Sequence, residues 1–139
     1  MRLAVLLLAL CLAACGSPQP QVTSVERSHM VVNGSRSTPI QDMRPRDADH
    51  VMLLVRVQNA PDEWEDAPLY LTNGAERYEP ALRMTRTEVS QSGAPQGPRE
   101  GGAVFNVPAN VTSFTLVLEG HLNVPVQADA AIQDELYTQ

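Results

Sequence analysis

The chain has 139 residues, and its 16 acidic residues outnumber its 10 basic residues, which gives a formal net charge of −6 at pH 7. This length suits a single domain and excludes a large catalytic α/β barrel. The acidic surplus argues against a nucleic-acid binder, because attraction to phosphate needs a surplus of Lys and Arg.

The first 14 residues are typical of a secretory signal peptide. Arg2 supplies one positive charge, and an apolar run from Leu3 to Ala14 follows it. This run is too short for a transmembrane helix, which needs about 20 residues. Thirteen of these 14 residues are apolar, so the signal peptide raises the hydrophobic content of the whole chain to 43 %. The apolar residues that follow it suffice for one modest core.

The end of this segment, Leu12-Ala13-Ala14-Cys15, resembles the lipobox of bacterial lipoproteins. The resemblance implies that residues 1–14 are removed and that Cys15 becomes the lipid-modified first residue. Two or three acyl chains anchor a protein stably, whereas one binds a membrane only marginally. Gly16, in place of Asp, implies the outer membrane, with the domain facing the periplasm. The alternative is an ordinary cleaved signal that leaves Cys15 as a free thiol.

Cysteine usage then limits the chemistry of the mature chain. Cys11 would leave with the signal and Cys15 would carry lipid, so no thiol remains for a disulfide, a redox pair or a nucleophile. The Pro-rich residues 15–21 are predicted to form a polar tether between the lipid and the domain.

The remaining residues, 22–139, show the patterns of β-strands. In Val51–Val57 the odd positions are predicted to share one face, and in Ser113–Glu119 the residues Phe114, Leu116 and Leu118 are predicted to face the core. Asn73-Gly74, between Leu69–Thr72 and Arg77-Tyr78, is a strong hairpin signal. Further strands are predicted at Val22–Val32, Ser35–Ile40, Leu82–Val89, Val104–Val107 and Val124–Ala128.

Turn-rich stretches separate these strands. Loops are predicted at Asn59–Pro68, Ser90–Gly102 and Pro108–Asn110, and Ala130–Tyr137 is predicted to be a short helix or a frayed tail. Seven to eight short strands without βαβ alternation predict one all-β domain, an antiparallel β-sandwich.

The order of motifs between Val51 and Glu119 resembles the immunoglobulin-like, telokin-like domain of unknown function found in bacterial lipoproteins. The resemblance is carried by the strand ending at Asn59, the Asn73-Gly74 hairpin, Val104-Phe105-Asn106-Val107-Pro108 and the strand that begins at Phe114. It implies an immunoglobulin-like sandwich and no catalytic residues.

Acidic residues gather around the single tryptophan in Asp62-Glu63-Trp64-Glu65-Asp66. A calcium loop would need alternating ligands and a glycine, so this run of like charge is typical of a solvated loop. Trp64 either packs over an open end of the sandwich or, with Asp62, Glu63, Glu65 and Asp66, contacts a partner.

A metal site is the alternative use of the polar residues near the N-terminal strands. Imidazole and thioether groups suit Cu(I), and the candidate ligands are His29, Met30, His50 and Met52. Methionines at such positions are also common core residues, and no cofactor is predicted.

Catalysis has little support from the sequence. The chain has no G-x-S-x-G, and its three histidines lack the spacing of a triad. A small envelope enzyme remains a second alternative, and it predicts a deep cleft with converging polar groups. The favoured hypothesis is a lipid-anchored envelope protein, not an enzyme, that binds or supports another envelope protein through a sandwich end or an exposed edge strand.

Overall fold

A computed structural model describes residues 18–139, apart from the side chains at positions 88, 96 and 98. The predicted signal peptide and Cys15 lie outside the described residues.

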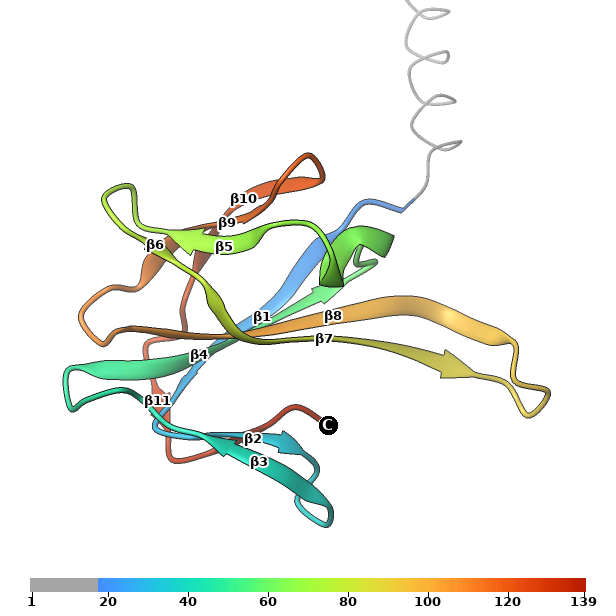
Figure 1. Cartoon of the computed structure of the whole chain (residues 1–139), viewed down its shortest axis with the longest axis horizontal. Helices are drawn as coiled ribbons and strands as arrows, with labels where there is room; N and C mark the ends of the chain where they lie inside the picture. Colours follow the sequence, from blue (N-terminus) through green and yellow to red (C-terminus); the bar gives the residue numbers. More distant parts are fainter. Residues whose placement is uncertain (1–17) are drawn as a thin grey trace, which may run out of the picture.

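Strands arranged in three sheets account for most of this part of the chain (Figure 1). A five-stranded sheet contains, in spatial order, β11 (Ile132–Gln133), β1 (Gln21–Ser28), β4 (His50–Gln58), β8 (Pro95–Pro108) and β7 (Pro80–Val89). A four-stranded sheet contains β10 (Leu122–Gln127), β9 (Ser113–Leu118), β5 (Leu69–Thr72) and β6 (Arg77–Tyr78). A three-stranded sheet contains β12 (Leu136–Tyr137), β2 (Val31–Gly34) and β3 (Pro39–Met43). One 3₁₀ turn, η1 (Asp62–Glu65), lies between β4 and β5.

The main core lies between the five-stranded and four-stranded sheets. The odd positions of β4 face it as predicted, and so do Phe114, Leu116 and Leu118 of β9. The Asn73-Gly74 hairpin also forms, pairing Leu71 with Tyr78. The all-β sandwich predicted from the sequence is therefore confirmed.

A second, smaller core lies on the other face of the five-stranded sheet. Its buried members are Val31, Met52, Leu54 and Val104, and partly buried residues of β3, β7 and β12 pack against them. The three-stranded sheet covers this face (Figure 1). Both faces of β4 are thus buried along its middle, where Met52 and Leu54 face the second core, while His50, Arg56 and Gln58 nearer its ends are only partly buried.

Four predicted segments are wrong, and the described residues form twelve strands where the sequence predicted seven to eight. The predicted strand Ser35–Ile40 begins only at Pro39, because residues 35–38 form the turn between β2 and β3. The predicted strand Val22–Val32 is two strands, because the chain turns at His29 and Met30 from the five-stranded into the three-stranded sheet. The predicted loop Ser90–Gly102 belongs largely to β8, and the predicted helix or tail after Ala130 forms β11 and β12. These last two strands pair in parallel with β1 and β2, so the sheets are mixed and not purely antiparallel.

Close packing explains the two adjacent glycines of β8, Gly101 and Gly102. A Cβ on Gly101 would lie 2.8 Å from Trp64 Cε2 and 2.9 Å from Ala60 Cβ. Glycine in a strand often marks such a close approach. Gly101 therefore leaves room for Trp64, Gly102 leaves room for Met84, and neither glycine breaks the strand.

Two arginine side chains on the five-stranded sheet donate hydrogen bonds to backbone oxygens of irregular segments. Arg27 is 6 % exposed, and its guanidinium donates to the backbone oxygens of Ala109, Asp129 and Ala130 at 2.9, 2.9 and 2.5 Å. Arg83 donates to the backbone oxygens of Trp64 and Ala67. Since a guanidinium carries five N–H donors, one side chain can satisfy several carbonyl groups that a strand ladder leaves unpaired.

Candidate partner-binding surface

Trp64 is fully buried, so it does not present its ring to a partner. The indole covers Gly101, and its Nε1–H donates to the backbone oxygen of Gly102 at 3.1 Å. The exposed fraction of Trp64 is 0 %. The structure thus removes Trp64 from the predicted contact surface, because a ring in this position completes the end of the main core.

The acidic neighbours of Trp64 are exposed. Asp62 forms an ion pair with Arg99 at 3.0 Å, and Glu63 lies 3.5 Å from His121 Nδ1. Glu65 and Asp66 are also exposed. One of the four carboxylates is therefore already paired with an arginine of the same domain, and a second lies beside a histidine.

This acidic turn lies at the end of the domain where the chain enters. Pro18, Gln19 and Pro20 line the same shallow hollow as Asp62 and His121. The amide of Asn59 donates to the backbone oxygen of Gln19 at 3.3 Å. The segment that leads into β1 is thus held against the acidic end.

The four candidate metal ligands have different environments. Met52 is 2 % exposed and belongs to the apolar second core. His50 Nδ1 lies 2.6 Å from Asp47 Oδ1, whereas His29 is exposed and Met30 is half-buried. Among the side chains that the structure describes, no group of three or more His, Cys, Asp or Glu has the arrangement of a metal site.

The His50–Asp47 contact has an electrostatic consequence. A carboxylate can only accept hydrogen bonds, so Nδ1 donates. This hydrogen bond is the largest of the effects that lower the pKa of Asp47 below its ordinary value of 3.8, and the backbone N–H of Asp49 assists. The pair closes the turn that precedes β4.

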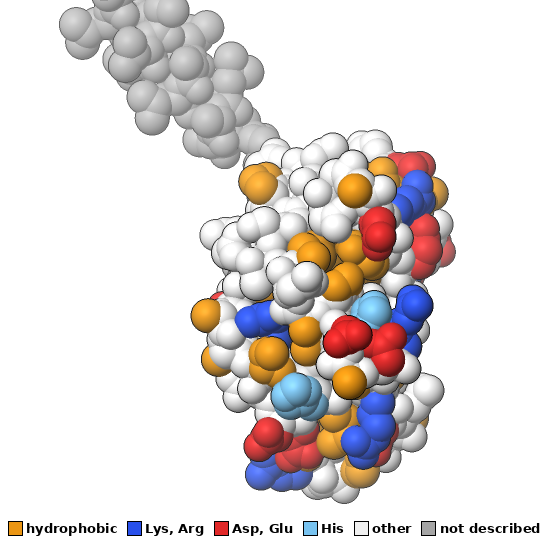
Figure 2. All heavy atoms as spheres, turned by 90° about the vertical axis from the view of Figure 1, so that its left-hand side faces the viewer, with side chains coloured by type: hydrophobic (Ala, Val, Ile, Leu, Met, Phe, Trp, Pro, Cys, Tyr) orange, Lys and Arg blue, Asp and Glu red, His pale blue; other side chains and the backbone are white. Residues whose placement is uncertain are grey.

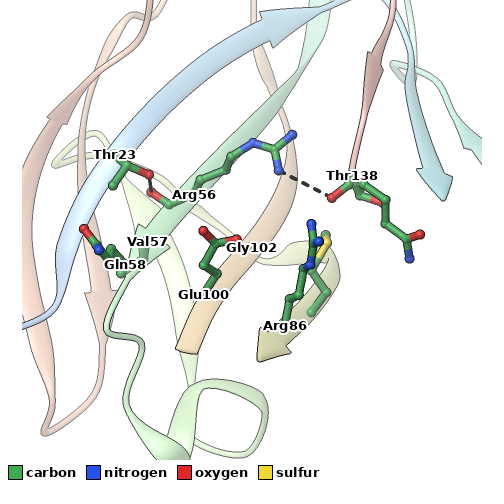
Figure 3. Close-up of a pocket in the computed structure, with 11 residues that line it drawn as sticks. Thr23, Arg56, Val57, Gln58, Arg86, Glu100, Gly102 and Thr138 are labelled. Carbon is green, nitrogen blue, oxygen red and sulfur yellow. Dashed lines mark hydrogen bonds between the residues drawn. The ribbon is translucent and has the colours of Figure 1, made fainter. Parts of the chain in front are cut away.

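A polar pocket of about 300 Å³ lies on the face of the five-stranded sheet that carries the second core, beside the last residues of the chain (Figure 3). Gly101 and Gly102 of β8 contribute to its lining, together with Arg56, Arg86 and Glu100. The guanidinium of Arg56 is engaged with the backbone oxygens of Tyr137 and Thr138, at 2.7 and 3.4 Å. The remaining lining residues are Thr23, Val57, Gln58, Met84, Thr138 and Gln139.

The outer edges of the sheets differ in length and in proline content. The edge strands β11, β12 and β6 have two residues each, β10 contains Pro125, and the five-residue β3 begins at Pro39. By contrast, β7 has ten residues with its proline at the first position, and only β8 pairs with it in the sheet. An unpaired edge of this length can accept a further strand.

The β7–β8 hairpin also extends beyond its neighbours. β4 pairs with β8 only as far as Glu100, whereas β7 continues its pairing with β8 to Pro95. Figure 1 shows the end of this hairpin projecting from the body of the domain. The sequence predicted the strand, but nothing local in it identifies β7 as the long edge, because edge position depends on the order of strands in the sheet.

The surface at the opposite end is chemically mixed. Figure 2, which views the molecule from the end away from the projecting hairpin, shows acidic and basic side chains interspersed with apolar ones. Mixed charge of this kind is typical of a solvated surface. The β7 edge is therefore the more distinctive candidate for a binding surface.

Comparison with protein-family models, with curated proteins and with solved structures finds no match for this chain. Among the described residues, no helix has the length and apolar character needed to cross a membrane.

Proposed function

We propose that this chain is a lipid-anchored envelope protein whose immunoglobulin-like domain binds another envelope protein without catalysing a reaction. The observation that carries the binding part is the unpaired ten-residue edge of β7. Edge strands recruit extended segments because their free N–H and C=O groups form a ready-made template.

The anchoring part of the proposal depends on the lipobox-like residues. Cys15 precedes the first described residue, Pro18, by only three positions, and Gln21 already begins β1. Such a short connection would hold the acidic end of the domain close to the membrane surface. The outer membrane, facing the periplasm, is the proposed location because Gly16 follows the cysteine.

The anchor is tested by the variant Cys15→Ser, compared with the unchanged chain after cell fractionation. Loss of the acylated sulfur should move the protein from the membrane fraction to the soluble fraction. Equal membrane association of both proteins would refute lipid anchoring at this residue.

Binding is tested by photo-crosslinking in intact cells, with a photoreactive amino acid placed at Thr85 of β7. The matched control position is Gln127, an exposed residue of the edge strand β10. The proposal predicts an adduct with another envelope protein from Thr85 and none from Gln127. Absence of an adduct at Thr85, or equal adducts at both positions, would contradict binding through the β7 edge.

A further inference from the structure

The regular part of the β7 edge is a stretch of five residues, Leu82–Arg86. Irregularities in the β7–β8 register interrupt the strand between Pro80 and Leu82 and again between Arg86 and Glu88. Among the described residues, the backbone hydrogen bonds made by turns and loops do not involve Leu82–Arg86. Since bulges limit strand pairing, an added strand would pair with β7 over this stretch.

The side chains of alternate residues, Leu82, Met84 and Arg86, lie on one face of β7, and their exposure and polarity increase toward Arg86. Leu82 and Met84 pack against the apolar second core, and both are half-buried. Met84 lies flat against β8, since its Cγ is 3.0 Å from the place that a Cβ on Gly102 would occupy. Arg86 is exposed, two residues farther along at the mouth of the polar pocket. Along this face an added strand would therefore meet two apolar side chains, Leu82 and Met84, and then the cationic side chain of Arg86.

The cation available to a partner is Arg86. The other arginine of the pocket, Arg56, already donates to the backbone oxygens of Tyr137 and Thr138, and it lies 3.9 Å from the carboxylate of Glu26. Arg86 is paired in register with Glu100 on one side, whereas its other side lies at the open edge. No ion pair joins Arg86 to a side chain that the structure describes.

Side chains on an added strand would stand beside these three residues. Directly opposed residues on neighbouring strands bring their Cβ atoms to about 4.5–5.5 Å, so opposite charges and apolar pairs are selected. A carboxylate can also accept two parallel hydrogen bonds from a guanidinium, which adds geometric specificity. Antiparallel addition would place the acidic residue first in the partner sequence.

We propose that the partner of the β7 edge is an extended segment with the pattern acidic-x-apolar-x-apolar, which pairs antiparallel with Leu82–Arg86 and places its carboxylate on Arg86 at the mouth of the pocket. This inference rests on the proposed function, because it names the chemistry of the segment that the edge receives. The two apolar side chains lie beside Met84 and Leu82.

The test uses a displayed library of nine-residue peptides selected against the full-length protein in detergent micelles, with hydrogen exchange at residues 82–86 to locate binding. Enriched peptides should carry Asp or Glu two residues before an apolar residue. The variant Arg86→Glu should weaken their binding about tenfold or more, as expected for a lost charge-assisted hydrogen bond. Replacing the acidic peptide residue by Lys should restore binding to that variant.

Two controls keep the result interpretable. Arg44→Glu reverses the charge of an exposed arginine next to β3 and should leave peptide binding unchanged, while Arg86→Gln shows whether the position tolerates a neutral side chain. Peptides that protect residues 82–86 without any acidic preference would overturn the inferred pattern and leave edge binding in place. If the selected peptides protect other residues, or if no peptide binds, both the pattern and binding through the β7 edge are overturned.

Discussion

Gly101 and Trp64 form one packing unit at the end of the main core. The variant Gly101→Ala should lower the free energy of unfolding by about 1–3 kcal/mol, because its Cβ would overlap the indole and Ala60. Urea unfolding followed by the fluorescence of Trp64 measures the change. Gly102→Ala is the matched control, since its Cβ meets the flexible side chain of Met84, which can shift. A cost at Gly102 equal to or larger than that at Gly101 would contradict this account of the packing.

Arg27 shows how a buried cation can be satisfied by backbone oxygens alone. The variant Arg27→Met should lower the free energy of unfolding by about 2–4 kcal/mol, because three carbonyl groups lose charge-assisted donors. The control Arg44→Met, at a side chain that is 68 % exposed, should change it by less than about 0.5 kcal/mol. Equal effects of the two substitutions would show that the carbonyl contacts of Arg27 do not stabilise the fold.

The turn before β4 gives stability a component that depends on pH. Because the pKa of Asp47 is lowered in the folded protein, its ionised form adds stability that is fully present above its ordinary value of 3.8. This contribution is lost as the pH falls through the lowered pKa. The stability difference between the unchanged chain and Asp47→Asn should therefore shrink below that pH in urea titrations.

The control for this pH effect removes the partner of the carboxylate. In a His50→Gln background the largest cause of the lowered pKa is absent, so substituting Asp47 should change the pH dependence less. An identical acid response in both backgrounds would show that His50 does not stabilise the Asp47 carboxylate.

At the scale of elements, the three-stranded sheet depends on the second core. Leu54→Ala should cost about 2–5 kcal/mol, because it removes a fully buried side chain from a core with few buried members. Hydrogen exchange should increase most in β2, β3 and β12. Leu116→Ala, the same change in the main core, should instead increase exchange most in β5, β9 and β10. Uniform loosening by both variants would contradict two separable cores.

The elements also show what periodicity can and cannot predict. The faces of β4 and β9 follow from side-chain alternation, and the β5–β6 hairpin follows from Asn73-Gly74, because these signals are local. The second face of β4 is covered by β2, β3 and β12. This cover could not be predicted from β4 itself, because it depends on the tertiary arrangement of other strands. Gly101 and Gly102 suggested a loop, because their close contacts with Trp64 and Met84 are tertiary and are not visible in a local sequence pattern.

The candidate site was only partly predictable for the same reason. The sequence indicated an edge strand and the acidic residues beside Trp64, but the burial of Trp64 and the position of β7 arise from the strand order. Met84 and Arg86 belong to no recognisable sequence motif. They became candidates for partner binding only because the structure places them beside the pocket and on the open edge of the sheet.

At the scale of the whole molecule, the proposed lipid at Cys15 would attach the domain to the membrane, and the proposed β7 edge would bind the partner. The acidic end beside Pro18 would face the membrane, and the β7–β8 hairpin extends from the same end of the five-stranded sheet, because β4 stops pairing with β8 at Glu100 (Figure 1). The binding edge would then be offered to a partner close to the membrane surface.

Backbone hydrogen exchange at Leu82–Arg86, compared between native membranes and the purified full-length protein, tests the pairing of β7 most directly. The account predicts slower exchange of these amides in native membranes, because a partner strand would pair with groups that are open in the isolated domain. Exchange in β10 should be the same in both samples and provides the internal reference. Equal exchange of Leu82–Arg86 in both samples would contradict recruitment of a partner through the β7 edge.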